Sequence, residues 1–189
     1  MDRRQRKTKA AIFKAFISLL SQKDYYKITV SEIIEAADIG RATFYAHFET
    51  KDFLLKELCE ELFCHVLTYD KQGNTNSSQL FDCSKPDTVF LHLLRHLQNN
   101  DNQILELLVG RNNELFLRYF KNQLANLVQN EFTLQKPNFS KPLPDDYFIN
   151  HISSTFVETV RWWKDNHDDM PPEQIHEYFL HVTQLDRVI

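Results

Sequence analysis

The chain has 189 residues, of which 25% are charged and 42% hydrophobic, and its formal net charge at pH 7 is −4. This length suffices for one large domain or two small ones, and the chain has only 3 Gly and 6 Pro to interrupt helices. Because no alternating apolar and polar pattern indicates strands, the expected fold class is all-α.

The charge is divided unevenly between the two parts of the chain. Residues 1–56 contain 11 Lys and Arg against 7 Asp and Glu, whereas the remainder contains 11 against 19. This asymmetry predicts an N-terminal part that faces nucleic acid, joined to a body that does not. Cys59, Cys64 and Cys83 are odd in number and lack C-x-x-C spacing, which argues against a disulfide scaffold or a zinc ribbon and favours a reducing, cytoplasmic location.

The first predicted helix covers residues 3–22. Its apolar residues recur with helical spacing and must pack on the segment that follows: Ile12, Phe13, Phe16, Ile17 and Leu20. Its first part carries a basic run: Arg3, Arg4, Arg6, Lys7 and Lys9. A charge run is usually a solvated face, but next to a DNA-reading unit we expect this one to lie along the phosphate backbone.

Residues 28–56 read as two short helices joined by a tight turn and followed by a third helix. Thr29 and Glu32 have the spacing of a capping box at the start of the first helix. The run 37–40 breaks the helical pattern with Gly40, in the three- to four-residue turn of a helix-turn-helix. On the second helix, residues 41–48, Phe44 and Phe48 lie four apart and face inward. Arg41, Thr43, Tyr45 and His47 are left to point outward.

Donor side chains on a short exposed helix are what a major-groove reader needs. Spacing alone leaves open an ordinary three-helix domain whose exposed face has no function. The residues themselves resemble the N-terminal DNA-binding domain of TetR-family transcriptional regulators, over roughly the first sixty residues. The motifs that carry this resemblance are Thr29-Val30, Ala36-Ala37, Ile39-Gly40, Thr43-Phe44-Tyr45, His47-Phe48 and Lys51.

The resemblance implies a homodimeric DNA-binding regulator whose DNA contacts come from a single small set of residues: Thr29, Arg41, Ala42, Thr43, Tyr45, His47 and Lys51. Arg41 suits guanine in the groove or a phosphate, and Thr43 suits a base edge or a thymine methyl group. Thr29 at a helix N-terminus, together with Tyr45, His47 and Lys51, is expected on the phosphate backbone, where contacts position rather than specify. The alternative for His47 is packing against Phe44.

The sequence departs from the family pattern at Asp38, where glycine is usual. Aspartate tolerates left-handed backbone angles better than most residues, so we expect the turn to be kept. Thr50 is expected to cap a long helix that runs to Asp70. By resemblance, this helix transmits a change in the body to the spacing of the two readers of a dimer.

The rest of the chain predicts a bundle of amphipathic helices. A polar, linker-like segment spans 72–85, and helices are expected over 87–98, 112–132 and 146–166, with an apolar stretch at 104–109 that Gly110 ends. Proline-rich residues 133–145 form a loop, and Pro171-Pro172 begins the last helix. Its inward residues are expected to be Ile175, Tyr178, Phe179, Val182 and Leu185.

The C-terminal part of the chain resembles, over about forty residues, that of a TetR subgroup that includes regulators of dihydroxyacetone-kinase operons. The resemblance is carried by Arg161-Trp162-Trp163-Lys164, the short acidic turn that follows and the proline start of the last helix. The resemblance implies a homodimer through the two C-terminal helices. Tryptophan is enriched at interface hot spots, so Trp163 is expected in the dimer interface, although at least one of the two tryptophans must belong to the core. An N-terminal DNA-binding domain is therefore expected over 1–56, and an effector-binding and dimerisation domain over 57–189.

Motifs for catalysis or for a cofactor are absent from the sequence, so the protein is not expected to be an enzyme. His92 and His96 lie four apart, but no Glu completes an H-E-x-x-H motif, and no metal is expected there. Cys59 and Cys64 are read as buried small residues. The basic N-terminus lacks the apolar run of a secretory signal, and no stretch approaches the ~20 apolar residues that cross a bilayer.

Three functions remain open. The first is a repressor whose body binds a small molecule, with His65, Tyr119 and His151 as candidate pocket residues. The second is a DNA-binding regulator, of the coactivator type, that answers to a protein partner. The third is a protein-interaction module whose reader is vestigial. The family's majority habit favours the repressor, with double-stranded DNA as its partner, a palindromic operator and an unidentified effector.

Overall fold

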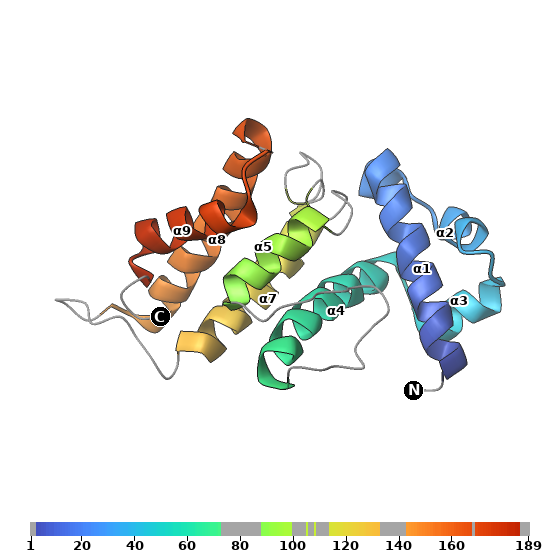
Figure 1. The fold of residues 1–189 in the computed structure, drawn as a ribbon. Coiled ribbons are helices and arrows are strands. Elements are labelled where there is room, and N and C mark those ends of the chain that lie inside the picture. Colours follow the sequence, from blue (N-terminus) through green and yellow to red (C-terminus); the bar gives the residue numbers. More distant parts are fainter. Residues whose placement is uncertain are drawn as a thin grey trace.

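The computed structural model describes residues 3–72, 88–99, 105, 108, 114–132, 143–167 and 169–185. All regular secondary structure within these ranges is helical, which confirms the expected all-α class. The N-terminal helices lie at one end of the molecule and the C-terminal helices at the other (Figure 1). No helix in the described ranges is long and apolar enough to cross a membrane.

The N-terminal unit consists of α1 (Arg3–Gln22), a 3-10 turn η1 (Tyr25–Lys27), α2 (Val30–Ala36) and α3 (Arg41–His47). The apolar stripe predicted on the first helix is buried in full. Phe13 of α1 packs on Phe48, with ring centroids 5.5 Å apart, and Phe48 lies 6.0 Å from Phe44. This aromatic contact fixes α3 against α1, because both of the phenylalanines predicted to face inward are at most 1% exposed.

Helix α4 (Lys51–Gln72) connects this unit to the body. Thr50 caps it as predicted, since its Oγ1 accepts a hydrogen bond of 3.0 Å from the backbone N–H of Phe53. Leu54, Leu58 and Leu62 are buried along one face. The helix packs on α5 and α7 in the body, and it crosses the expected domain boundary at residue 56 without interruption.

The body is built from α5 (Val89–Asn99), α7 (Glu114–Phe132), α8 (Asp145–Asn166) and α9 (Pro172–Thr183). Helix α7 packs between α4 and α8, and α9 packs on α5 and α8. Leu105 and Leu108, from the apolar stretch, are helical and buried. Of the predicted linker at 72–85, Gln72 is the last residue of α4, and the rest lies outside the described residues. Most of the predicted proline-rich loop, at 133–142, also lies outside them.

Several side chains are placed differently from the sequence prediction. Tyr178 and Val182 were expected to face inward, but they are 42% and 68% exposed, because the core of α9 is formed by Ile175, Phe179 and the following Leu185. Of the tryptophan pair, Trp163 was expected in the dimer interface but is a core residue, 1% exposed, whereas Trp162 is 41% exposed. Cys59 is buried as expected, but the prediction was wrong for Cys64, whose position on α4 is exposed.

Candidate nucleic-acid interface

The start of α2 is held by a reciprocal capping box, as predicted. Thr29 Oγ1 accepts from the backbone N–H of Glu32 at 3.3 Å, and the backbone N–H of Thr29 donates to the Glu32 carboxylate at 2.8 Å. Glu32 also forms an ion pair with Lys23. The hydrogen bond from Lys23 and those from Thr29 lower the pKa of Glu32 to about 2. A phosphate near Thr29 would therefore share the helix N-terminus with a carboxylate.

The turn between α2 and α3 is made by Asp38, and glycine is not required for it. Asp38 has φ of 51°, in the left-handed region where aspartate is tolerated. Gly40 has φ of −77°, and a Cβ placed there would come no closer than 3.7 Å to its nearest neighbour, Thr43 Oγ1. The expected departure from the family pattern thus keeps the turn, but the residue that permits it is Asp38 and not Gly40.

Helix α3 exposes a polar face, and its opposite face is buried through Phe44. Arg41, Ala42 and Thr43 are exposed, and Tyr45 is 48% exposed while its ring packs edge-on against Phe44 at 5.4 Å. The guanidinium of Arg41 donates to Ser31 Oγ on α2 at 3.1 Å. Sequence reasoning missed Ser31, because the spacing within one helix does not reveal a contact across the turn.

His47 and Lys51 are less accessible than the other candidates. The His47 side chain is half-buried, and its ring lies 6.2 Å from that of Phe48 rather than against Phe44. Lys51 Nζ donates to the backbone carbonyls of Tyr25 and Ile28 at 2.8 and 2.7 Å, and it lies 4.2 Å from the centroid of the Tyr25 ring. Burial lowers the pKa of Lys51. Lys51 thus holds the segment before α2 against α4.

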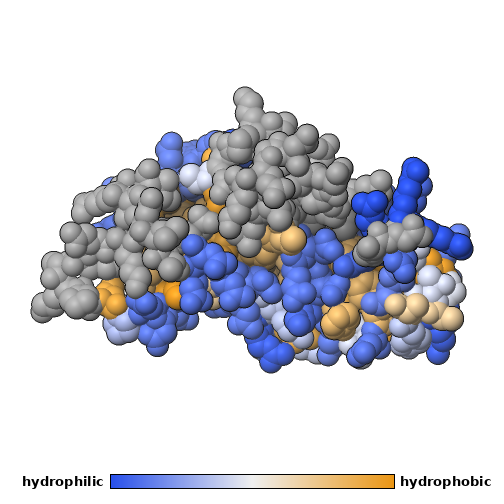
Figure 2. All heavy atoms as spheres, turned by 90° about the horizontal axis from the view of Figure 1, so that it is seen from below, coloured by the Kyte–Doolittle hydropathy of each residue, from blue (hydrophilic) through white to orange (hydrophobic). Residues whose placement is uncertain are grey.

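The basic run on α1 divides into two groups. Arg3, Arg4, Arg6 and Lys7 are exposed. Lys9 was expected to lie along the phosphate backbone with the rest of the run, but this is wrong, because its Nζ lies 2.7 Å from Glu57 and 2.8 Å from Glu61 on α4. In Figure 2 the most hydrophilic side chains in view gather at the end of the molecule formed by the N-terminal helices. Four cationic side chains at the start of α1 thus remain exposed.

In the body, His92 and His96 are buried, with their Nε2 atoms 3.0 Å apart. Arg95 bonds to Glu173 of α9. Within the described residues no group of three or more His, Cys, Asp or Glu side chains is placed to hold a metal.

Of the predicted pocket residues, His151 lines a hollow between α8 and the end of α9, and Tyr119 does not. Tyr119 is half-buried, and His151 is exposed and stacks on Tyr147. The side chain of His65 lies outside the described residues. The hollow between α7 and α8 is lined by neither Tyr119 nor His151.

Residues 84–184 match the family model of a transcriptional regulator C-terminal region, and residues 12–58 match that of bacterial regulatory proteins of the tetR family. The chain belongs to the TetR family. This regulator is 30% identical over 150 residues to DhaS, the HTH-type dhaKLM operon transcriptional activator of Lactococcus lactis, a match that covers 79% of this chain and 71% of DhaS.

Two further similarities support the family assignment. The crystal structure of a TetR transcriptional regulator from Streptococcus agalactiae superposes with a TM-score of 0.70 at 35% identity, over 96% of both chains. YxbF of Bacillus subtilis, an uncharacterised HTH-type transcriptional regulator, is 33% identical over 102 residues, which cover 51% of this chain and 26% of YxbF. The chain is therefore a TetR-type regulator over both its N-terminal and its C-terminal parts.

Proposed function

We propose that this TetR-family regulator is a ligand-responsive repressor that binds a palindromic operator as a homodimer in the bacterial cytoplasm. The observation that carries the proposal is the exposed face of α3, where Arg41, Thr43 and Tyr45 stand above two buried phenylalanines. A short rigid helix with donors on its outer side can enter the major groove of DNA. The functional division is proposed at residue 56, with the reader before it and the regulatory body after it.

The candidate DNA contacts divide by chemistry. Arg41, already oriented by Ser31, is proposed to reach a guanine edge, since a guanidinium can donate two hydrogen bonds to O6 and N7. Ala42 and Thr43 are proposed to face bases, where small side chains allow close approach. Thr29, Tyr45, His47 and Lys51 are proposed to contact the phosphate backbone and to fix the register of α3.

A homodimer through α8 and α9 is supported by apolar side chains left exposed on these helices. Trp162 and Tyr178 contact each other with ring centroids 6.4 Å apart, and Val182 is 68% exposed. A two-fold symmetric dimer presents two copies of α3 and therefore matches a palindrome, with half-sites about 34–36 Å apart.

The proposal is tested by selecting bound sequences from random DNA duplexes with the purified protein at near-physiological salt. Recovery of a palindrome with half-sites about one helical turn apart is the expected result. An Arg41→Ala variant serves as the comparison, because losing one bidentate contact should cost about 1–3 kcal/mol and relax the preference at one position of each half-site. Recovery of only salt-sensitive, sequence-independent binding would contradict the proposal.

A second candidate is an activator controlled by a protein partner, and the similarity to DhaS favours it, because DhaS is named as an operon activator. Both candidates predict operator binding, but they differ in what changes it. A repressor of the proposed kind releases its operator when a small molecule binds the body. A partner-dependent activator stays on its operator and activates transcription only when the partner protein is present. A transcription assay on the selected operator distinguishes the two.

A further inference from the structure

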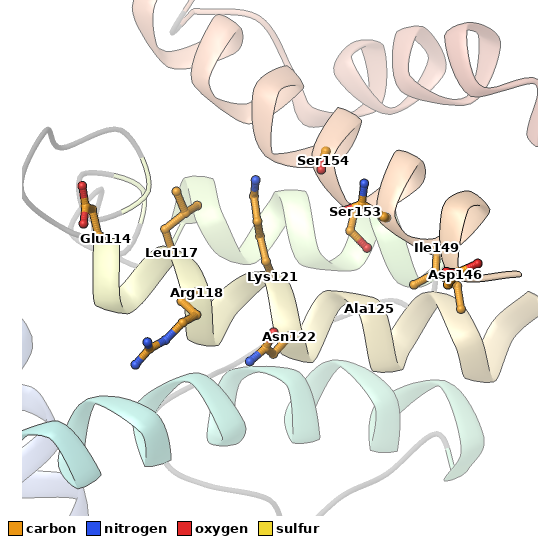
Figure 3. A pocket seen from close by; sticks show the side chains of 11 residues that line it. Glu114, Leu117, Arg118, Lys121, Asn122, Ala125, Asp146, Ile149, Ser153 and Ser154 are labelled. Atoms are coloured by element: carbon orange, nitrogen blue, oxygen red, sulfur yellow. The ribbon is translucent and has the colours of Figure 1, made fainter.

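A groove of about 610 Å³ lies between α7 and α8 in the body (Figure 3). Its volume is within the range of about 300–1,000 Å³ that small-molecule sites occupy. Leu117 and Ala125 of α7 and Ile149 of α8 supply apolar surface to it. An apolar surface of this kind suits the hydrocarbon part of a ligand and gives it no preferred orientation.

The orienting groups are polar and lie among these apolar side chains. Ser153 on α8 lines the groove and is 4% exposed, and its Oγ is the buried side-chain polar atom that lacks a hydrogen-bond partner among the described residues. Two other hydroxyls of the body bond to the preceding turn of their helix: Thr159 of α8 donates to the carbonyl of Thr155 at 2.8 Å, and Thr183 of α9 donates to that of Phe179 at 2.6 Å. Ser153 makes no such bond, which leaves its hydroxyl available to a ligand.

Lys121 supplies a positive charge to the same groove. It reaches from α7 toward α8, whereas Arg118 turns away from α8 (Figure 3). No ion pair links Lys121 to the described residues, in contrast with Lys9, which is held by two carboxylates. Glu114 and Asp146 lie at the two ends of the groove, so its centre is positive. An ammonium and a hydroxyl can both donate to a carboxylate, which is an acceptor with two oxygens.

We propose that this groove binds a small organic acid. Its carboxylate accepts hydrogen bonds from Lys121 Nζ and Ser153 Oγ, and its apolar part covers Leu117, Ala125 and Ile149. In the proposed repressor this site would hold the effector. The binding of the acid does not depend on the proposed function, but its effect on DNA binding does. Since α7 packs on both α8 and α4, an acid that binds one arrangement of α7 better than another shifts the helix that carries the reader.

The test is calorimetric titration of the full-length protein, without DNA, with three monocarboxylates: butanoate, octanoate and phenylacetate. At least one is expected to bind with one site per chain, and the uncharged alcohol of the same skeleton is expected to bind at least tenfold more weakly. Lys121→Met should weaken the acid at least tenfold. Lys14→Met, which removes an exposed lysine of α1, should leave the affinity unchanged.

Ser153→Ala separates a ligand contact from a purely structural role. Without ligand it should unfold at a higher temperature than the wild type, because a buried hydroxyl without a partner is removed. It should nevertheless bind the acid several-fold more weakly. No binding by any of the three acids, or equal affinity in Lys121→Met and the wild type, would overturn the proposal.

The two proposals fail separately. An operator recovered by selection together with no acid binding removes the groove site and leaves the DNA-binding regulator standing. Acid binding without a recovered operator supports the site and contradicts the proposed repressor.

Discussion

At the scale of single residues, the candidate phosphate contacts differ in what else they do. Tyr45 is 48% exposed, and its ring packs on Phe44. Lys51 is half-buried, and its ammonium donates to two backbone carbonyls that precede α2. A substitution of Tyr45 therefore changes mainly the surface offered to DNA. A substitution of Lys51 also removes a link within the fold.

Tyr45→Phe should weaken binding to all DNA sequences alike, with unchanged stability and an unchanged salt dependence, because no charge is lost. Lys51→Ala should lower the free energy of unfolding by about 1–3 kcal/mol, since carbonyl acceptors lose a charged donor. If Lys51 also contacts a phosphate, the slope of log K against log salt falls by about one. Urea unfolding and DNA titrations at several salt concentrations measure both effects. A loss confined to one DNA sequence in Tyr45→Phe would show that Tyr45 reads bases.

Glu32 gives the N-terminal unit a defined dependence on pH. Its pKa is lowered from 4.5 to about 2 by the hydrogen bond from Lys23 and those from Thr29. The stabilisation is therefore complete above about pH 4.5, and it is lost as the pH falls toward 2. Wild type should be more stable than Glu32→Gln at pH 7, and the difference should shrink over that interval. Urea unfolding at several pH values measures it, and a difference that does not vary with pH would reject this role.

At the scale of elements, α4 joins the DNA-binding unit to the body, and ion pairs hold α1 against α4. Lys9 Nζ lies between Glu57 and Glu61, one turn apart on α4. Burial acts to lower the pKa of Lys9, but the hydrogen bonds with Glu57 and Glu61 outweigh it, and the pKa is raised. A movement of α4 is therefore expected to carry α1 with it.

Lys9→Met should lower the free energy of unfolding by about 1 kcal/mol, because Glu57 and Glu61 are left as neighbouring negative charges. The matched variant Lys14→Met removes an exposed lysine of the same helix, and its effect should stay within about 0.5 kcal/mol. Chemical denaturation of both variants makes the comparison. Equal stability of the two would mean that the cluster around Lys9 contributes nothing to the joint between α1 and α4.

At the scale of the whole molecule, one hydrophobic core extends from the reader through α4 to α9. Apolar side chains outside that core remain on α8 and α9, among them Trp162, Tyr178 and Val182. Trp163, by contrast, is 1% exposed, and its Nε1–H donates to the carbonyl of Met170 at 3.1 Å. The two adjacent tryptophans therefore serve different purposes, one in the fold and one on the surface proposed for the dimer.

Val182→Lys should shift the protein toward monomer in sedimentation while the fold of each chain is retained, because a cation near the C-terminus of α9 suits the helix dipole. Trp163→Ala should instead lower the free energy of unfolding by about 3–5 kcal/mol, through the cavity that it leaves. An unchanged sedimentation coefficient for Val182→Lys would show that this part of α9 lies outside the dimer interface.

The sequence by itself determined the all-α class, the boundaries of α1, the capping box of Thr29 and Glu32, and the inward position of Phe44 and Phe48. These features depend on contacts within one helix or one turn, so helical periodicity and local hydrogen bonding specify them. The family resemblance was legible for the same reason, because its motifs lie in one continuous stretch.

Only the tertiary structure decided which side chains from different helices contact each other. Lys9 could not be separated from its basic neighbours until α4 placed two carboxylates beside it. Helical spacing placed both Trp162 and Trp163 on one helix. Trp163 is the buried one, and its Nε1–H donates to the carbonyl of Met170, in the turn before α9. The groove between α7 and α8 brings together residues about thirty positions apart in the sequence. Ser153 matters there because its hydroxyl has no hydrogen-bond partner among the described residues, which the sequence alone does not show. Such long-range pairings are set by how the helices pack, which a local pattern does not encode.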